Sequence, residues 1–205
     1  MMHLKIRTNV LKLITSICIL MISFNTKVIV YADNTATTSF STHKYSGGVG
    51  NLLLYVDYAS GTSSWEPYII QGISGWMYTG WDNPIYITAV SSNNGSNMDF
   101  YTNDGSYWGV GNTVLAQTFH YNSSNTSVSP YSYDWYWTKI LINDTNFRAD
   151  DFTNDQAKGT ILHEMGHAMG LKHNNSNPNS IMCQTSAERA VQYTDNAAII
   201  TLYGN

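Results

Sequence analysis

The sequence predicts one α+β domain, and three observations support this fold class. Five short segments are rich in β-branched, aromatic and aliphatic residues, which favours strands. Between the first two of them, apolar residues recur at helical spacing. Near the carboxyl end, polar capping residues precede a second segment of helical periodicity that contains two histidines. The 205 residues are enough for one domain with a substantial core.

The first elements alternate strand and helix signals. Strands are expected at residues 52–58, 84–90, 97–101, 114–121 and 137–143. A helix is expected at 64–78. Its apolar residues Ile69, Ile70, Ile73 and Trp76 keep near-helical spacing, and Pro67 falls in its first turn. The predicted order is therefore one strand, one helix and four strands, followed by a helical carboxyl-terminal part.

The second helix follows residues 150–155, whose Asp, Thr and Asn side chains suit a helix N-terminus. Its apolar stripe comprises Ala157, Ile161, Met165 and Ala168. This stripe is expected to face the core, because residues at such spacing share one side of a helix.

Residues 163–173 contain the spacing H-E-x-x-H-x-x-G-x-x-H. His163 and His167 lie one turn apart on one helix face, so both imidazoles can reach one ion. Gly170 can adopt a positive φ, end the helix and bring back His173 as a third ligand. Three protein ligands leave the fourth position of a tetrahedral zinc ion open to water, which is the arrangement of a catalytic site.

Glu164 follows the first of these histidines and lies about 100° further round the helix. It can stand beside the metal as a general base without being a ligand, so the spacing favours hydrolysis by activated water. One alternative is a polar helix face with solvated histidines. Another is a zinc-holding binding module without turnover, which would keep the three histidines but would not require Glu164.

The motif resembles that of the metzincin zinc metalloproteases, and the chain is most similar to the matrixins among them, over the catalytic domain only. The resemblance implies a twisted, mixed five-stranded sheet with the zinc-site helix packed against it, a methionine turn at Met182, and a C-terminal helix within residues 195–204. It also implies an endopeptidase whose substrate lies extended along an edge strand. Leu115, Ala116 and Gln117 are the candidate substrate-binding residues.

The residues after the methionine depart from the family pattern. Cys183 and Gln184 stand where animal matrixins tend to have Tyr-Pro, so the wall of the main specificity pocket cannot be inferred by analogy. Cys183 is also the single cysteine beyond the first 32 residues, which excludes an internal disulfide there. It is either a buried apolar residue or an exposed thiol near the site.

Other candidate sites have weaker signals. Calcium is a second candidate cofactor, at Asp99 and at Asp104-Gly105, but no EF-hand pattern is present and turn chemistry explains these residues better. His120 fits an ordinary core or surface histidine. The aromatic run at 131–137 fits core and sheet packing, with a sugar-stacking surface as the alternative.

Residues 1–32 resemble a signal peptide for export. Basic residues precede an apolar run at 13–24, and Ala32 ends an A-x-A-like cleavage site. An uncleaved membrane anchor is the alternative, but polar residues at 25–27 interrupt the run before the roughly 20 apolar residues that a span requires. We therefore expect a secreted, extracellular protein without a membrane partner once the signal is removed.

Residues 33–49 are Ser/Thr-rich and end near two glycines, so this segment is expected to be flexible, and residues 50–205 are expected to form the catalytic domain. Four of the ten basic residues lie in the signal and none of the 14 acidic ones do, so residues 33–205 carry a net charge of −8 with neutral histidines. This balance disfavours nucleic acid as a partner. We expect a monomer that acts on a protein or peptide substrate.

Overall fold

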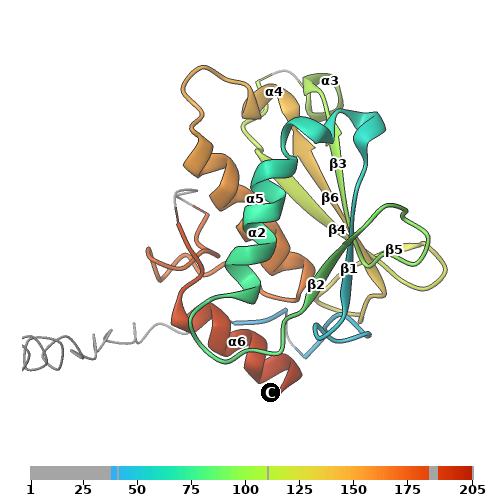
Figure 1. The fold of residues 1–205 in the computed structure, drawn as a ribbon, viewed down its shortest axis with the longest axis vertical. Helices are drawn as coiled ribbons and strands as arrows, with labels where there is room; N and C mark the ends of the chain where they lie inside the picture. The colour runs from blue at the N-terminus through green and yellow to red at the C-terminus, as the bar shows by residue number, and fades with distance from the viewer. Residues whose placement is uncertain (1–37, 41, 110, 185–188, 205) are drawn as a thin grey trace, which may run out of the picture. The chain divides into compact units, whose positions relative to one another are not determined.

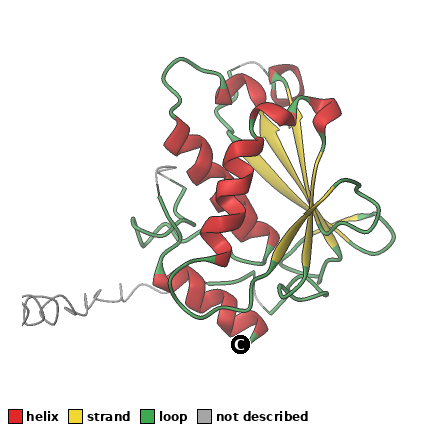
Figure 2. Cartoon of the chain, viewed as in Figure 1, coloured by secondary structure: helices red, strands yellow, loops and turns green. Residues whose placement is uncertain are grey.

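The computed structural model describes residues 38–40, 42–109, 111–184 and 189–204, so the expected export signal lies outside the described residues. Over the described part, helices and one mixed sheet form an α+β unit (Figure 1). Helices α2 (Glu66–Met77) and α5 (Asn154–Ala168) pack against each other, and α5 also contacts the sheet. Figure 2 shows the longer helices on one side of the sheet and short helices at one end of its strands.

The sheet has six strands in the order β2-β1-β3-β6-β4-β5. They are β1 (Leu52–Val56), β2 (Ile87–Val90), β3 (Met98–Asn103), β4 (Ala116–Tyr121), β5 (Ser127–Val128) and β6 (Trp137–Asn143). Strands β2, β1, β3 and β6 are parallel neighbours, whereas β4 is antiparallel to both β6 and β5. The predicted fold class, with its mixed sheet, is confirmed.

The sheet contains one strand more than the five that the sequence predicts. The additional strand, β5, pairs with His120 and Tyr121 at the end of β4. It follows a tight turn in which Asn125 has a φ of 59° and Asn122 donates its backbone N–H to Thr126 at 3.0 Å. A two-residue strand is too short to show an alternating pattern, so the sequence does not reveal it. It covers the end of β4 and leaves the earlier part of that edge uncovered.

The remaining helices are α3 (Gly105–Trp108), α4 (Asp144–Phe147) and α6 (Tyr193–Tyr203), with short 3-10 helices η1 (Tyr58–Ser60) and η2 (Thr62–Ser64). Helix α5 begins at a capping box. Thr153 accepts a hydrogen bond from the backbone of Gln156 at 3.2 Å, and the Gln156 side chain accepts one from the backbone of Thr153 at 2.8 Å. Among the described residues, no helix is both long and apolar enough to cross a bilayer.

The helix that carries the histidines is held in place by the core. Its residues Ile161 and Met165 have no exposed surface. Trp76 of α2 donates its indole N–H to the carbonyl of Leu162 at 3.0 Å, and Trp135 donates to that of Ala168 at 3.0 Å. A buried polar group without a partner is costly, so these two indoles find acceptors on α5 and fix its position against α2 and the sheet.

The described residues of the 33–49 segment pack against the domain, which differs from the loose lead segment that their composition suggests. Phe40, Tyr45 and Val49 are buried in the core. The backbone N–H of Phe40 donates to the carbonyl of Gly170 at 2.9 Å, next to the loop after α5. Three apolar residues among many Ser and Thr residues are enough to anchor the segment, although they leave its average composition polar.

Asp99 in β3 gives the fold an expected pH dependence. Its carboxyl is buried, and Ser96 donates a hydrogen bond to it. Burial raises the pKa of Asp99 from 3.8 to about 6, and the Ser96 hydrogen bond offsets part of this increase. An acid whose pKa is raised in the folded state favours folding when it is protonated, so this contribution is lost as the pH rises from about 4 to above about 6.

We therefore expect Asp99→Asn to increase the free energy of unfolding by about 2 kcal/mol near pH 8 and by less than about 1 kcal/mol near pH 4. Urea denaturation of the native chain and the variant at the two pH values measures this difference. An equal effect at both pH values, or a loss of stability in alkaline solution, would contradict it.

Candidate metal centre

Three histidines meet at the carboxyl end of α5. His163 and His167 lie on its last turns, and Gly170 reverses the chain with a φ of +107°. His173 then lies beside the helix, with its Nε2 atom 3.0 Å from Nε2 of His167. One nitrogen from each of the three imidazoles lies within 4.8 Å of the others. The three candidate ligands therefore form one group.

Backbone carbonyls hold the outer nitrogens of two imidazoles. Nδ1 of His163 lies 2.7 Å from the carbonyl oxygen of Ile181, and Nδ1 of His167 lies 2.7 Å from that of Leu171. A carbonyl can only accept, so each Nδ1 carries the proton and each Nε2 keeps a lone pair for a metal. Two nitrogens on one tetrahedral zinc ion are about 3.3 Å apart. The arrangement therefore fits a zinc ion with three protein ligands.

Burial keeps two of these imidazoles neutral. It lowers the pKa of His167 well below the usual value, and the nearby charge of His163 lowers it further. Burial likewise lowers the pKa of His173 to about 4. Neutral imidazole is the form that binds a metal, so both side chains are ready to act as ligands at neutral pH.

Glu164 lies next to the imidazoles, but the hydrogen bonds that it accepts come from a residue of the sheet. The side chain is 6% exposed. Thr118 of β4 donates its hydroxyl hydrogen toward Oε2 of Glu164 at 2.7 Å and toward the Glu164 carbonyl oxygen at 3.0 Å. Burial raises the pKa of Glu164, while the charge of His163 and the Thr118 hydrogen bonds lower it in part. A buried carboxyl in a cleft is a candidate for proton transfer.

Met182 lies beneath the histidine helix, at the position predicted for the methionine turn. Its side chain is fully buried. A Cβ atom built on Gly166 would lie 2.4 Å from Sδ of Met182, so the helix approaches this methionine at a distance that only glycine permits. Asn174 donates its backbone N–H to the Met182 carbonyl at 2.9 Å, which joins the turn to the loop that carries His173.

An open cleft of about 720 Å³ runs along β4 and contains the three imidazoles and Glu164. The candidate substrate-binding residues Leu115, Ala116 and Gln117 all line it. Asn143 donates its backbone N–H to Leu115 at 2.8 Å, and hydrogen bonding alternates along an antiparallel pair. Leu115 and Gln117 therefore turn their backbone groups to β6, whereas Ala116 turns its own to the open edge, where a peptide could pair.

Several residues of the cleft have no role predicted from the sequence, among them Phe40 and Thr160. Thr160 lies one turn before Glu164, and helical spacing could have placed it there. Its buried hydroxyl has no hydrogen-bond partner within the described ranges. The ring of Phe40 lies 5.6 Å from that of His167 and 5.0 Å from that of Tyr131. No local pattern could have revealed this contact, because it joins distant parts of the chain.

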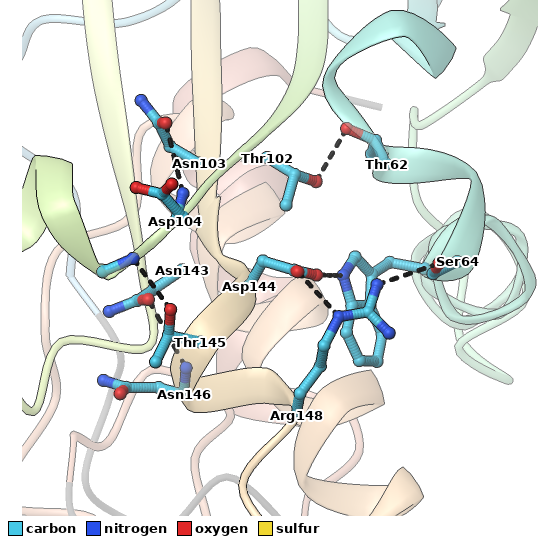
Figure 3. Close-up of polar contacts among 12 residues, drawn as sticks. Thr62, Ser64, Thr102, Asn103, Asp104, Asn143, Asp144, Thr145, Asn146 and Arg148 are labelled. Atoms are coloured by element: carbon cyan, nitrogen blue, oxygen red, sulfur yellow. Dashed lines mark hydrogen bonds and ion pairs between the residues drawn. The ribbon is translucent and has the colours of Figure 1, made fainter.

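Local structure accounts for the residues considered for calcium. Asp104 accepts a hydrogen bond from the backbone of Ser106 at 3.0 Å and caps α3. The backbone of Gly105 donates to the Thr145 hydroxyl at 2.8 Å (Figure 3). Asp99 lies inside the sheet. Within the ranges that the structure covers, the three histidines are the only group of three or more metal-binding side chains close enough to share an ion. Turn and cap chemistry thus explains Asp104-Gly105.

A second cluster in Figure 3 fixes the segment that leads into α5. Asp144 accepts hydrogen bonds from the indole of Trp65 at 2.8 Å and from Nε of Arg148 at 2.7 Å. Arg148 also donates to Ser64 at 3.1 Å and lies over the Trp65 ring. These contacts connect α4 to η2 at the carboxyl end of β6. The role of the cluster is therefore structural.

The other residues singled out from the sequence are mainly part of the core. His120 is buried, which lowers its pKa to about 4, and its Nε2 lies 3.1 Å from the carbonyl of His167. Cys183 is buried at the wall of the cleft, in agreement with the apolar alternative. In the aromatic run, Trp135 is fully buried, whereas Tyr131 is exposed beside the cleft.

A mixed sheet packed against a helix with two histidines, a third histidine after a glycine turn, and a methionine beneath them together define a zinc-dependent metalloprotease. Comparison with known families agrees. The family model described as Matrixin matches residues 81–204, and the chain belongs to this family. The resemblance seen in the sequence is thereby confirmed. Comparison with curated proteins finds no match.

Proposed function

We propose that this matrixin is a secreted zinc endopeptidase in which Glu164 acts as the general base. The position of Glu164 carries the proposal. Its side chain lines the open cleft next to three imidazoles, while its Oε2 atom is bound by Thr118. A zinc site that only stabilises a fold has four protein ligands and no need of a neighbouring base. Three histidines beside a carboxylate in a cleft suit hydrolysis.

The reaction follows from these groups. A zinc ion held by His163, His167 and His173 would lower the pKa of water and polarise the scissile carbonyl. Glu164 takes a proton from the attacking water and delivers it to the leaving amine, so one water is consumed for each peptide bond broken. The open edge of β4, at Ala116, aligns an extended substrate through backbone hydrogen bonds.

The proposed substrate is a protein or peptide outside the cell. The net charge of −8 over residues 33–205 disfavours nucleic acid and anionic membrane surfaces. The apolar run at 13–24, with its cleavage site, supports export, and we propose a monomeric product that begins at Asp33. The second candidate is a zinc-holding binding module without turnover, against which the placement of Glu164 argues.

The proposal predicts cleavage that depends on zinc. The full chain is expressed, and protein from the culture medium is loaded with zinc and incubated with a mixed peptide library. We expect cuts within the peptides, loss of cleavage after a chelator removes the metal, and recovery when zinc returns. Mass spectrometry reads the cut sites and the first residue of the collected protein. Cleavage that survives removal of zinc would contradict the proposal, and bound zinc without any cleavage would favour the binding module.

A further inference from the structure

We propose that Thr118 is a positioning residue for Glu164, an inference that rests on the proposed function. The two residues belong to different elements, β4 and α5. The Thr118 hydroxyl lies 2.7 Å from Oε2 of Glu164 and 3.0 Å from the carbonyl oxygen of the same residue. One side chain on the edge strand thus contacts both the carboxylate of the proposed base and the helix backbone that carries it.

This contact distinguishes the two oxygens of the carboxylate. Oε2 accepts the hydrogen bond from Thr118, whereas Oε1 accepts none from any residue that the structure covers. Glu164 is 6% exposed, so few water molecules can replace a lost partner. With Oε2 held against the sheet, the carboxylate has one preferred rotamer, and Oε1 is the oxygen left to take a proton from water.

The contact serves the base in both of its protonation states. When Glu164 is ionised, the Thr118 hydroxyl donates to a carboxylate oxygen. When Oε1 holds the proton, Oε2 is still a carbonyl-type acceptor and keeps the same hydrogen bond. The side chain therefore does not have to turn between accepting the proton from water and giving it to the amine.

The backbone of Thr118 has a separate role. Hydrogen bonding along β4 alternates, and Leu115 faces β6, so Thr118, like Ala116, turns its N–H and C=O to the open edge. The same residue can thus align a peptide through its backbone and orient the base through its side chain. A side-chain substitution leaves the backbone groups in place, so its effect should fall on kcat and not on KM.

The test uses three variants of the full chain, each loaded with zinc. Thr118→Val removes the hydroxyl at nearly constant volume, and Thr118→Ser restores it. Thr88→Val makes the same change on the exposed face of β2, at the other edge of the sheet. We expect Thr118→Val to lower kcat about tenfold with KM and zinc content unchanged, and Thr118→Ser to stay within about threefold of the native chain. Thr88→Val should match the native chain.

Two kinetic results would overturn the proposal. One is a zinc-bound Thr118→Val variant that keeps the native kcat. The other is an equal loss of kcat in Thr118→Ser and Thr118→Val, which would mean that packing and not the hydroxyl matters. If the native chain cleaves no peptide, the proposed function fails by itself. In that case, crystal structures of the zinc-bound native and Thr118→Val proteins test the positioning role. A Glu164 carboxylate in the same orientation in both proteins would overturn it. A carboxylate that is rotated in the variant would support it.

Discussion

Replacing Glu164 with glutamine is expected to lower kcat/KM for peptide cleavage by about a thousandfold while zinc stays bound. Glutamine has the shape of glutamate but cannot accept a proton from water. It can keep the hydrogen bond from Thr118 through its amide oxygen, so the cleft should remain intact. The three imidazoles are unchanged, and the outer nitrogens of His163 and His167 still bond to the carbonyls of Ile181 and Leu171.

The change in kcat/KM is measured by steady-state kinetics on one peptide from the library. Zinc content is measured on the same samples. Glu66→Gln is the matched control, because Glu66 lies in the first turn of α2, away from the residues that line the cleft. The control should cleave at the native rate. A Glu164→Gln variant that holds zinc and cleaves as fast as the native chain would exclude Glu164 as the base.

Replacing Asp195 with alanine is expected to lower the free energy of unfolding by about 3–5 kcal/mol, since each buried group left without a partner costs about 1–3 kcal/mol. Asp195 is fully buried at the start of α6. It accepts hydrogen bonds from the Ser180 hydroxyl at 2.5 Å and from the backbone of Ile181 and of Gln192, each at 3.0 Å. It therefore ties the methionine turn to the C-terminal helix.

The same substitution should weaken zinc binding, because the carbonyl of Ile181 holds Nδ1 of His163. Denaturant unfolding of the zinc-free protein and a zinc titration measure the two effects. Asp195→Asn should lose less stability, since an amide can accept at the backbone donors and donate to Ser180. Asp155→Ala, at an exposed position in α5, should cost less than about 1 kcal/mol. An Asp195→Ala variant as stable as this control would show that Asp195 does not connect the methionine turn to the C-terminal helix.

The elements that the sequence predicts well are those with strong local signals. The expected strand at 137–143 coincides with β6, whose centre is apolar and β-branched. The helix expected at 64–78 is observed as α2, Glu66–Met77. The strand expected at 84–90 begins only at Ile87. Pro84 has no N–H, and that of Ile85 is taken by the Asn83 side chain at 2.9 Å, so these residues do not join the ladder.

The elements that the sequence misses depend on contacts between distant residues. Strand β5 has only two residues and exists because it meets the end of β4. The segment around Phe40 reads as flexible from its composition, but it pairs with the loop after Gly170, which only the folded chain brings near. The hydrogen bond between Thr118 and Glu164 likewise joins two elements that are far apart in the sequence.

By itself, the sequence determined the metal chemistry of this matrixin. The helical repeat places His163 and His167 on one face, and Gly170 permits the turn to His173, so local geometry is sufficient to gather three ligands. Only the tertiary structure decided which groups surround that centre. The packing of β4 on α5 settles which oxygen of Glu164 is held and which backbone groups face the cleft, because such contacts depend on the whole core and not on the spacing of any one element.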